Sequence, residues 1–253
     1  MRDAIEVRGV SRRFDGYSAL ENINLTVEAG TFVSLVGPSG CGKSTLLNLI
    51  AGLLPPSEGS VSVFGESLRG LNRRAAYMFQ QDALLPWKTV RQNIALGLEL
   101  RGEPSPEKTT EWIRKVGLDG FGDRYPHQLS GGMRKRVAMA QVFITDPAIL
   151  LMDEPFSALD VHTRHRMEAE ALSLWQDSGK TVLFVTHDLE EAIALSDRVV
   201  LLSAGPGSRI AGQYDIDLAR PRNLLDMKTD RRFQEIYSAI WRTLREEVLK
   251  THE

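Results

Sequence analysis

Cysteine is scarce in this sequence, and neither sign of charge is in excess. Cys41 is the one cysteine among 253 residues, which excludes an internal disulfide and fits a reducing compartment. Lys and Arg number 31 and Asp and Glu 33, for a formal net charge of −2. Without a basic surplus, the composition gives no support to a nucleic-acid partner.

Long apolar runs are missing as well. No stretch approaches the roughly 18 apolar residues that span a bilayer, and the patch Leu46–Leu54 is interrupted by Asn48 and Gly52. The first residues, MRDAIEVRGVSRRF, contain no apolar core of a secretory signal. Hydrophobic residues make up 42% and charged residues 25%, which is typical of globular proteins. We therefore expect a globular cytosolic chain, one that can still dock on a membrane protein.

Short apolar stretches alternate with stretches of helical periodicity. Strands are predicted at Thr31–Gly37, Ala75–Gln80, Ala148–Met152 and Thr181–Thr186. Helices are predicted between them, the first at Lys43–Gly52. This alternation favours an α/β fold with a largely parallel sheet in a single domain, residues 1–253.

Two segments are helical without intervening strands. Residues of about 81–145 are predicted to form an inserted helical subdomain, in which Ser105 caps a helix that begins at Pro106. Residues of about 228–250 are predicted to form a C-terminal helical extension. Its apolar positions fall on one helical face, which most simply packs on the domain.

A glycine-rich stretch, GPSGCGKST, lies between the strand at Thr31–Gly37 and the helix at Lys43–Gly52. It matches the phosphate-loop pattern G-x-x-x-x-G-K-[ST] in the structural context that this pattern requires. Lys43 is expected to reach the β- and γ-phosphates, and the Ser44 hydroxyl to hold Mg²⁺. The predicted nucleotide contacts are Gly37, Pro38, Ser39, Gly40, Cys41, Gly42, Lys43, Ser44 and Thr45.

Four polar residues at predicted strand ends are candidates for the chemistry. Asp153 is predicted to hold Mg²⁺, and Glu154 to act as the general base for the attacking water. Gln80 is predicted to contact Mg²⁺ and that water, and His187 to stabilise charge on the γ-phosphate or to orient the base. Each has a simpler interpretation, as a turn residue, a surface amide or a structural histidine.

A second anion-seeking helix start follows the phosphate loop. In HQLSGGMRKRVAMAQ, Ser130, Gly131, Gly132 and Met133 open a helix whose free N–H groups and dipole favour negative charge. One nucleotide needs only one such helix end from a phosphate loop. The residues alone do not say which anion the second one serves.

The ordered set of these motifs, with SALD at 157–160, resembles the ATP-binding subunit of ABC transporters over nearly the whole chain. The resemblance implies a P-loop NTPase (RecA-like) core with an antiparallel β subdomain and the inserted helical subdomain. It implies that two ATPase subunits, as a homodimer or an unlike pair, pack head to tail, so that Ser130–Met133 of one serve the ATP of the other. Asp160 is then expected at the dimer interface. Phe14 is expected to stack on adenine, with Tyr17 as the alternative.

The same resemblance implies an ATPase that uses ATP and Mg²⁺ and docks on transmembrane permease subunits at the cytoplasmic face of the membrane. LLPWKTV, LSGGMRKR and MDEPFSALDVHTR are most similar to importer subunits for nitrate, sulfonate, taurine and related solutes, which receive solute from a periplasmic or extracellular binding protein. The family's signature motif corresponds to LSGGM at Leu129–Met133 and usually ends in Gln, where this chain has Met133. We expect ATPase activity to survive this change.

Two alternatives to a transport ATPase remain open. The chain can be a non-transport ABC ATPase that acts on nucleic acid or ribosomes, although it has one cassette and no heptad insertion. It can be an interaction protein with an inactive nucleotide site, against which Lys43, Asp153, Glu154 and His187 argue. Within the transporter hypothesis, residues 80–88 and the nearby helical subdomain are predicted to receive a permease helix, the alternative being that Leu84, Leu85 and Trp87 fill the subdomain core.

Overall fold

The structure is a computed structural model that describes residues 3–157, 161–176, 178–220, 222 and 227–250. Its larger sheet has six strands in the order β10-β9-β3-β8-β7-β6. These are β10 (Ile210–Asp215), β9 (Arg198–Leu202), β3 (Phe32–Val36), β8 (Thr181–Val185), β7 (Ile149–Asp153) and β6 (Ala75–Met78). All neighbours in this sheet are parallel except β10, which is antiparallel to β9 and had not been predicted.

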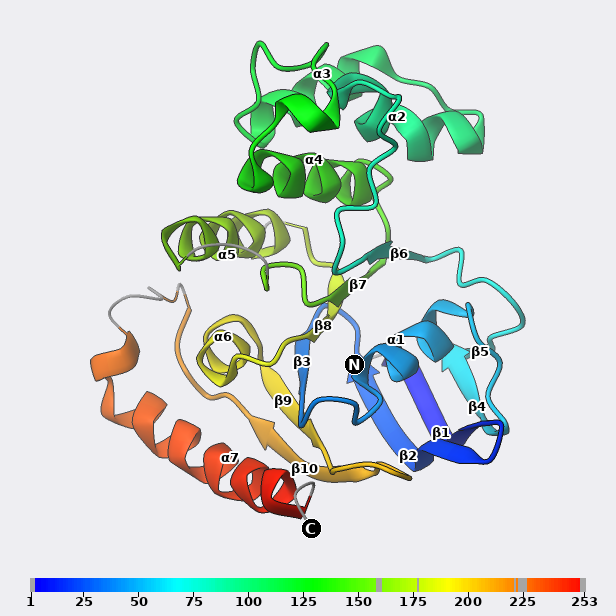
Figure 1. Cartoon of the computed structure of the whole chain (residues 1–253), viewed down its shortest axis with the longest axis vertical. Helices are drawn as coiled ribbons and strands as arrows, with labels where there is room; N and C mark the ends of the chain where they lie inside the picture. Colours follow the sequence, from blue (N-terminus) through cyan, green and yellow to red (C-terminus); the bar gives the residue numbers. More distant parts are fainter. Residues whose placement is uncertain (1–2, 158–160, 177, 221, 223–226, 251–253) are drawn as a thin grey trace.

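The smaller sheet is antiparallel, with the strand order β2-β1-β4-β5. Its strands are β2 (Tyr17–Glu28), β1 (Asp3–Phe14), β4 (Glu58–Val63) and β5 (Glu66–Ser67). The helix α1 (Lys43–Ala51) lies between the two sheets (Figure 1), and its buried Leu46, Leu47 and Ile50 join one apolar cluster with strands of both. The antiparallel subdomain implied by the family resemblance is confirmed.

Three helices gather at one end of the molecule (Figure 1): α2 (Val90–Arg101), α3 (Pro106–Lys115) and α4 (Gly131–Phe143), with a 3-10 turn at Pro126–Gln128 before α4. Ser105 caps α3 and Pro106 is its first residue, as predicted. Trp112 of α3 packs on Phe143 of α4, with ring centroids 5.8 Å apart. The same apolar cluster continues into α5 (Val161–Gln176) and the large sheet, so it anchors these helices to the core.

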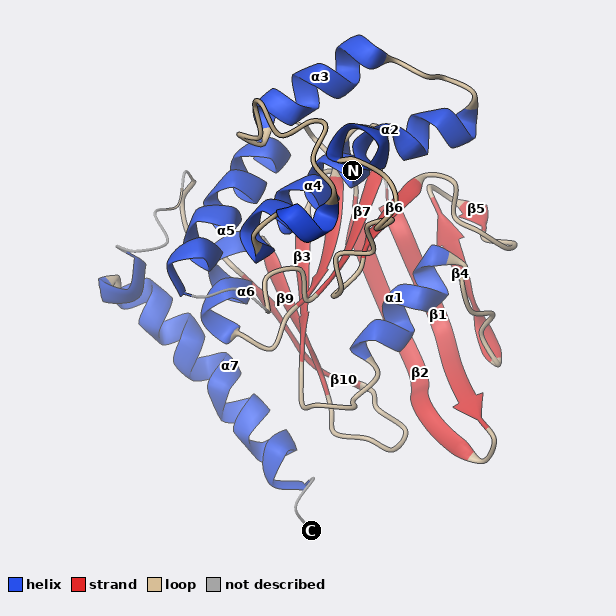
Figure 2. Cartoon of the chain, turned by 45° about the horizontal axis from the view of Figure 1, so that its top comes forward, coloured by secondary structure: helices blue, strands red, loops and turns tan. Residues whose placement is uncertain are grey.

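The C-terminal part comprises α6 (Leu189–Leu195), a 3-10 turn at Met227–Thr229 and α7 (Arg231–Lys250), which runs along one side of the molecule (Figure 2). Phe233, Ile236 and Ile240 of α7 are buried against α6 and β9. The prediction that the whole apolar stripe packs on the domain is wrong for Trp241 and Val248, which are 47% and 36% exposed. The Trp241 ring instead stacks on Tyr237 of the same helix, with ring centroids 6.3 Å apart.

The strand that precedes Gln80 is shorter than predicted. The strand predicted at Ala75–Gln80 ends at Met78, because the chain leaves the sheet at Phe79, which is 45% exposed. Gln80 therefore stands on a loop rather than at the strand end. Within the described ranges, no helix has both the length and the apolar character needed to cross a bilayer.

Candidate nucleotide site

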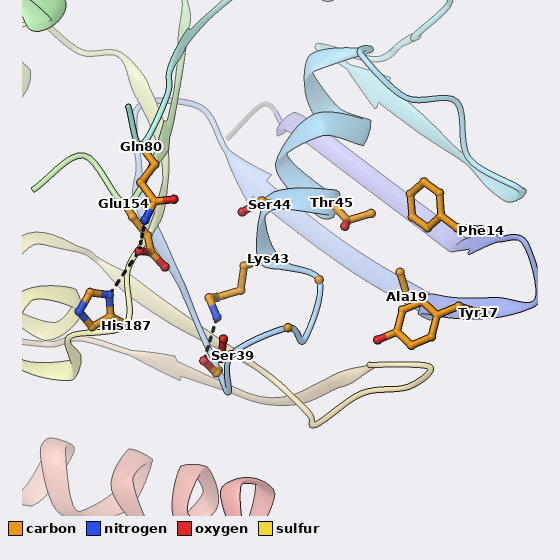
Figure 3. A pocket seen from close by; sticks show the side chains of 13 residues that line it. Phe14, Tyr17, Ala19, Ser39, Lys43, Ser44, Thr45, Gln80, Glu154 and His187 are labelled. Carbon is orange, nitrogen blue, oxygen red and sulfur yellow. Dashed lines mark hydrogen bonds and ion pairs between the residues drawn. The ribbon is translucent and has the colours of Figure 1, made fainter. Parts of the chain in front are cut away.

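A pocket of about 620 Å³ opens beside the N-terminus of α1, where the two sheets meet. Five separate segments of the chain contribute side chains to it (Figure 3). The lining residues are Phe14, Tyr17, Ala19, Gly37, Ser39, Gly40, Gly42, Lys43, Ser44, Thr45, Gln80, Glu154 and His187. Most of the predicted site is thus assembled in one place, and Ala19 is a lining residue that the motifs did not indicate.

The phosphate loop leaves the helix start of α1 open. Gly42 is the N-cap residue, with φ of 88°, and it offers no side-chain acceptor to the first amides of the helix. The first turn carries no acidic residue that could take the place of an anion. A Cβ at Gly37 would lie 2.8 Å from the Leu202 carbonyl oxygen, so only glycine allows this close approach. The loop therefore presents amide groups and a helix dipole to a bound phosphate.

The Lys43 ammonium is held inside this loop. Its Nζ donates to the carbonyl oxygens of Gly37 and Pro38, at 2.9 Å each, and the residue is 8% exposed. Pro38 and Cys41 do not line the pocket. Cys41 is fully buried, and burial raises the pKa of its thiol against the opposing effect of Lys43. The cysteine is therefore a small packing residue, and its position gives no support to blockage of the site by thiol reagents.

Asp153 ends β7 and accepts two hydrogen bonds on its two carboxylate oxygens. The Ser44 hydroxyl donates to Oδ1 at 3.0 Å, and the Tyr77 hydroxyl to Oδ2 at 3.2 Å. Burial raises the pKa of Asp153, while these two hydrogen bonds lower it. A hydroxyl and a carboxylate side by side are oxygen ligands of the kind that Mg²⁺ prefers. Tyr77 was missed, because only the register of β6 beside β7 brings it to Asp153.

Glu154 is the centre of a second group of polar side chains. Its Oε2 accepts a hydrogen bond from Gln80 Nε2 at 3.0 Å and lies 3.4 Å from His187 Nδ1 (Figure 3). The three residues follow β6, β7 and β8, which are neighbours in the parallel sheet. The structure therefore brings together all three predicted catalytic residues at the carboxyl edge of this sheet, where α/β folds place their sites.

The hairpin of β1 and β2 supplies the aromatic side of the pocket. Phe14 and Tyr17 are 37% and 48% exposed there. The Arg12 guanidinium lies 4.4 Å from the centroid of the Phe14 ring, on which it makes a cation–π contact. Both aromatic rings line the pocket, so the geometry leaves Phe14 and Tyr17 as candidates for stacking on a base.

The second helix start, at α4, is not part of this pocket. Ser130 caps α4, and its hydroxyl oxygen accepts the Met133 amide at 3.3 Å. Ser130 and Gly131 are exposed, and Gly132 is half-buried. None of Ser130–Met133 is among the residues that line the pocket. Met133 packs on the apolar cluster of the helices, while Asp160 lies outside the described residues.

The chain is similar in sequence to several known proteins. The model of the family described as ABC transporter matches residues 20–157. An uncharacterized ABC transporter ATP-binding protein of Methanocaldococcus jannaschii is 46% identical over 99% of this chain and 95% of its own length. An aliphatic sulfonates import ATP-binding protein of Bacillus cereus is 44% identical over 92% of each chain. A taurine import ATP-binding protein of Escherichia coli K12 is 46% identical over 82% of each.

The solved structures include a similar fold. A dimeric ATP-binding cassette in a post-hydrolysis state, bound to ADP and Pi, superimposes with a TM-score of 0.75 at 31% identity. The match covers 85% of this chain and all of that one.

Proposed function

The chain belongs to the ABC transporter family of ATP-binding proteins, and from this premise we propose that it hydrolyses ATP to power an importer of a small solute. The observation that carries the proposal is the convergence of Gln80, Glu154 and His187 beside the phosphate loop. Sulfonate and taurine importers among the relatives favour a small anionic or zwitterionic solute of that kind. The same relatives favour transport over the alternative of an ATPase that acts on nucleic acid or ribosomes.

The proposed reaction assigns one role to each group. The open start of α1 and the Lys43 ammonium bind the phosphates, and this preorganised positive environment stabilises charge in the transition state. The Glu154 carboxylate accepts a proton from the water whose oxygen attacks the γ-phosphorus, and the bond between that phosphorus and the bridging oxygen of ADP breaks. Gln80 orients the water, and His187 orients Glu154, which it approaches to 3.4 Å.

Mg²⁺ fits the oxygens of Ser44 and Asp153, with the Gln80 amide oxygen as a third candidate ligand; when bound, it neutralises charge on the β- and γ-phosphates. Partial burial of Asp153 raises the pKa of its carboxyl group, so Mg²⁺ competes with protons for this ligand. The Tyr77 hydrogen bond opposes this effect and keeps the carboxylate available.

Head-to-tail pairing of two subunits explains the second helix start. Ser130–Met133 lie outside the pocket of their own chain, yet the α4 N-terminus is exposed and favours an anion. Similarity to a dimeric cassette supports a partner that brings its own phosphate loop to this turn. A homodimer is the simplest form of this pair.

Permease subunits are the proposed membrane partner at the cytoplasmic face, with an extracytoplasmic solute-binding protein acting through them. A groove of about 790 Å³ lies next to the loop of Gln80, and its rim carries Leu71, Phe79 and Leu100, which are 65%, 45% and 80% exposed. An amphipathic cytoplasmic helix of the permease fits such an apolar surface, because contiguous exposed apolar patches mark partner sites. Trp87 is 71% exposed, so the alternative that it fills the subdomain core is wrong for this residue, whereas Leu84 does pack on that core.

The first test of the proposal is Glu154→Gln in the full-length chain. Loss of the general base should lower the turnover of ATP by about 10²–10⁴-fold, while ATP binding persists, because the amide keeps the shape and can still accept from Gln80. Turnover is measured as phosphate release, and binding with labelled ATP. Lys43→Ala is the matched contrast, since it should weaken binding itself. Hydrolysis by Glu154→Gln at the wild-type rate would remove Glu154 from the role of base.

The second test maps the permease. Cysteines introduced at Leu100, Ala83 or Lys88 should crosslink to the permease in the assembled transporter, and a cysteine at Ser238, on an exposed face of α7, should not. Cys41 does not interfere, because it is fully buried. Absence of crosslinks from all three positions in an active transporter would show that the permease docks elsewhere.

A further inference from the structure

A buried basic side chain joins the loop of Gln80 to α4. Lys135 of α4 is 3% exposed, and its Nζ donates to the main-chain oxygen of Gln80 at 2.6 Å. The same Nζ lies 3.1 Å from Asp82 Oδ1. An ammonium this deeply buried is strongly destabilising when it loses its partners, so α4 and the segment of Gln80 and Asp82 are held together.

The contacts continue to Ser130–Met133 at the start of α4, the signature turn. Asp82 Oδ2 lies 3.0 Å from Arg134 Nε, and Arg134 donates through a second nitrogen to the Leu129 carbonyl oxygen at 2.9 Å. Leu129 immediately precedes Ser130, the cap of α4. At the other end, the Gln80 side chain donates to Glu154. A continuous series of hydrogen bonds and ion pairs thus runs from the proposed general base to the helix start that serves another nucleotide.

We propose that Lys135 and Asp82 couple the ATP site of one subunit to the signature turn that this subunit lends to its partner's site, an inference that rests on the head-to-tail dimer proposed above. When the Gln80 side chain turns from Glu154 toward bound nucleotide, the main chain of Gln80 is displaced. The Lys135 ammonium carries this displacement into α4, and Arg134 carries it to the carbonyl beside Ser130. Lys135 and Asp82 are therefore positioning residues and touch no reacting atom.

The chain offers a matched control on the same helix. Arg136 also makes an ion pair from α4, at 2.6 Å to Glu170 of α5, and donates to the Val116 carbonyl oxygen at 3.1 Å. These contacts lead to α5 and to the end of α3, away from Gln80. If the coupling depended only on the packing of α4 against the rest of the chain, loss of the Arg136 contacts should lower cooperativity as much as loss of the Lys135 contacts.

The test is ATP hydrolysis by the full-length chain as a function of MgATP concentration, for wild type, Lys135→Met, Asp82→Asn and Arg136→Gln. We expect a wild-type Hill coefficient clearly above 1, lowered toward 1 by Lys135→Met and by Asp82→Asn, and retained by Arg136→Gln. Binding of ATP to single subunits, measured with Glu154→Gln in dilute solution, should change less than twofold. A merely structural role of Lys135 would lower activity or the melting temperature without changing the Hill coefficient.

Three outcomes would overturn the inference: wild-type cooperativity in both Lys135→Met and Asp82→Asn, an equal loss in Arg136→Gln, or a wild-type Hill coefficient of 1. Asp82→Asn is the milder change and keeps the test decisive if Lys135→Met does not fold. Failure of the proposed function has a different signature, namely no hydrolysis by wild type above that of Lys43→Ala.

Discussion

Adjacent carboxylates at the end of β7 have separate partners because the backbone turns between them. Glu154 has φ of 44°, in the left-handed region that residues other than glycine rarely adopt. Such conformations cost of order 1–3 kcal/mol and persist where the surrounding structure enforces them, commonly at functional sites. The turn directs Glu154 to Gln80 and His187, while Asp153 stays with Ser44 and Tyr77. The two carboxylates therefore have different surroundings, which suits the separate roles of general base and cation ligand that we propose for them.

The turn that carries His187 is fixed by a buried glutamate. Thr186 donates its hydroxyl to Glu191 of α6 and accepts the Asp188 amide. Burial raises the pKa of Glu191 well above its ordinary value of 4.5; the Thr186 hydrogen bond lowers it, and the charges of Glu168 and Asp188 raise it further. Asp188 in turn forms an ion pair with Arg164, whose Nη1 lies 3.7 Å from Asp188 Oδ2.

This raised pKa predicts a pH-dependent stability. The folded chain keeps a proton on Glu191 that the unfolded chain releases above pH 4.5, so stability falls as pH rises from 4.5 toward the folded pKa. Glu191→Gln cannot ionise and should become more stable relative to wild type across that window, by at most about 1.4 kcal/mol per pH unit. Urea unfolding at several pH values measures this, with the exposed Glu246→Gln as control. Parallel stability curves for Glu191→Gln and wild type would contradict it.

Among the elements, the three neighbouring parallel strands β6, β7 and β8 fix the position of the candidate site. The carboxyl ends of β6, β7 and β8 meet at one edge, so residues that are distant in sequence become neighbours. The helices begin at residues with a clear local role: Thr89 and Gln92 form a capping box at α2, Ser105 caps α3 and Ser130 caps α4. α1 differs from these three helices, because its glycine cap gives the first amides no side-chain acceptor.

The capping box at α2 predicts a local loss of stability that spares the nucleotide site. Thr89 accepts the Gln92 amide, so Thr89→Ala should cost about 1 kcal/mol, or roughly 2–4 °C in the melting temperature of a chain of this size. ATP binding should be unchanged, because no residue of α2 lines the pocket. Thermal unfolding measures the change, and the exposed Ser238→Ala serves as control. A cost no larger than that of Ser238→Ala would show that the box contributes little.

In the whole molecule, two helix starts favour an anion, and of these the α1 start lines the pocket whereas Ser130–Met133 at the α4 start do not. The α1 start opens into the pocket, and the α4 start lies in the helical group at one end of the molecule (Figure 1). In a head-to-tail pair, each ATP site is a composite of the phosphate loop of one subunit and the signature turn of the other. The α1 start and the α4 start of one chain therefore belong to different composite sites. Lys43 and Ser130 of one chain then belong to two different ATP sites.

Mixed dimers test this assignment. With Lys43→Ala in one subunit and Ser130→Arg in the other, both lesions fall on one composite site and the second stays intact. With both changes in one subunit and a wild-type partner, each site is damaged once. We therefore expect more ATP occluded per dimer in the first arrangement, measured with Glu154→Gln in all subunits. A model in which each signature turn serves its own phosphate loop requires the reverse order, and equal occlusion would remove support for the head-to-tail pair.

Features that depend on neighbouring residues and on periodicity could be predicted before the fold was known. The phosphate loop, the caps Ser105 and Ser130, the apolar strands of the large sheet and the helical insertion are local patterns, because each arises from residues a few positions apart. The resemblance built on their order also predicted the antiparallel sheet, which the structure confirms.

Contacts between residues that are distant in the sequence could not be predicted from it, because they depend on how the elements pack. Gln80 and Glu154 are 74 positions apart, and Tyr77 and Asp153 are 76, and both pairs depend on the register of β6 beside β7. Neither the contact of Lys135 with the Gln80 carbonyl nor the exposure of Trp241 and Trp87 has a local signal. Packing geometry selects among side chains that the sequence pattern treats alike, because burial and pairing depend on which surfaces meet.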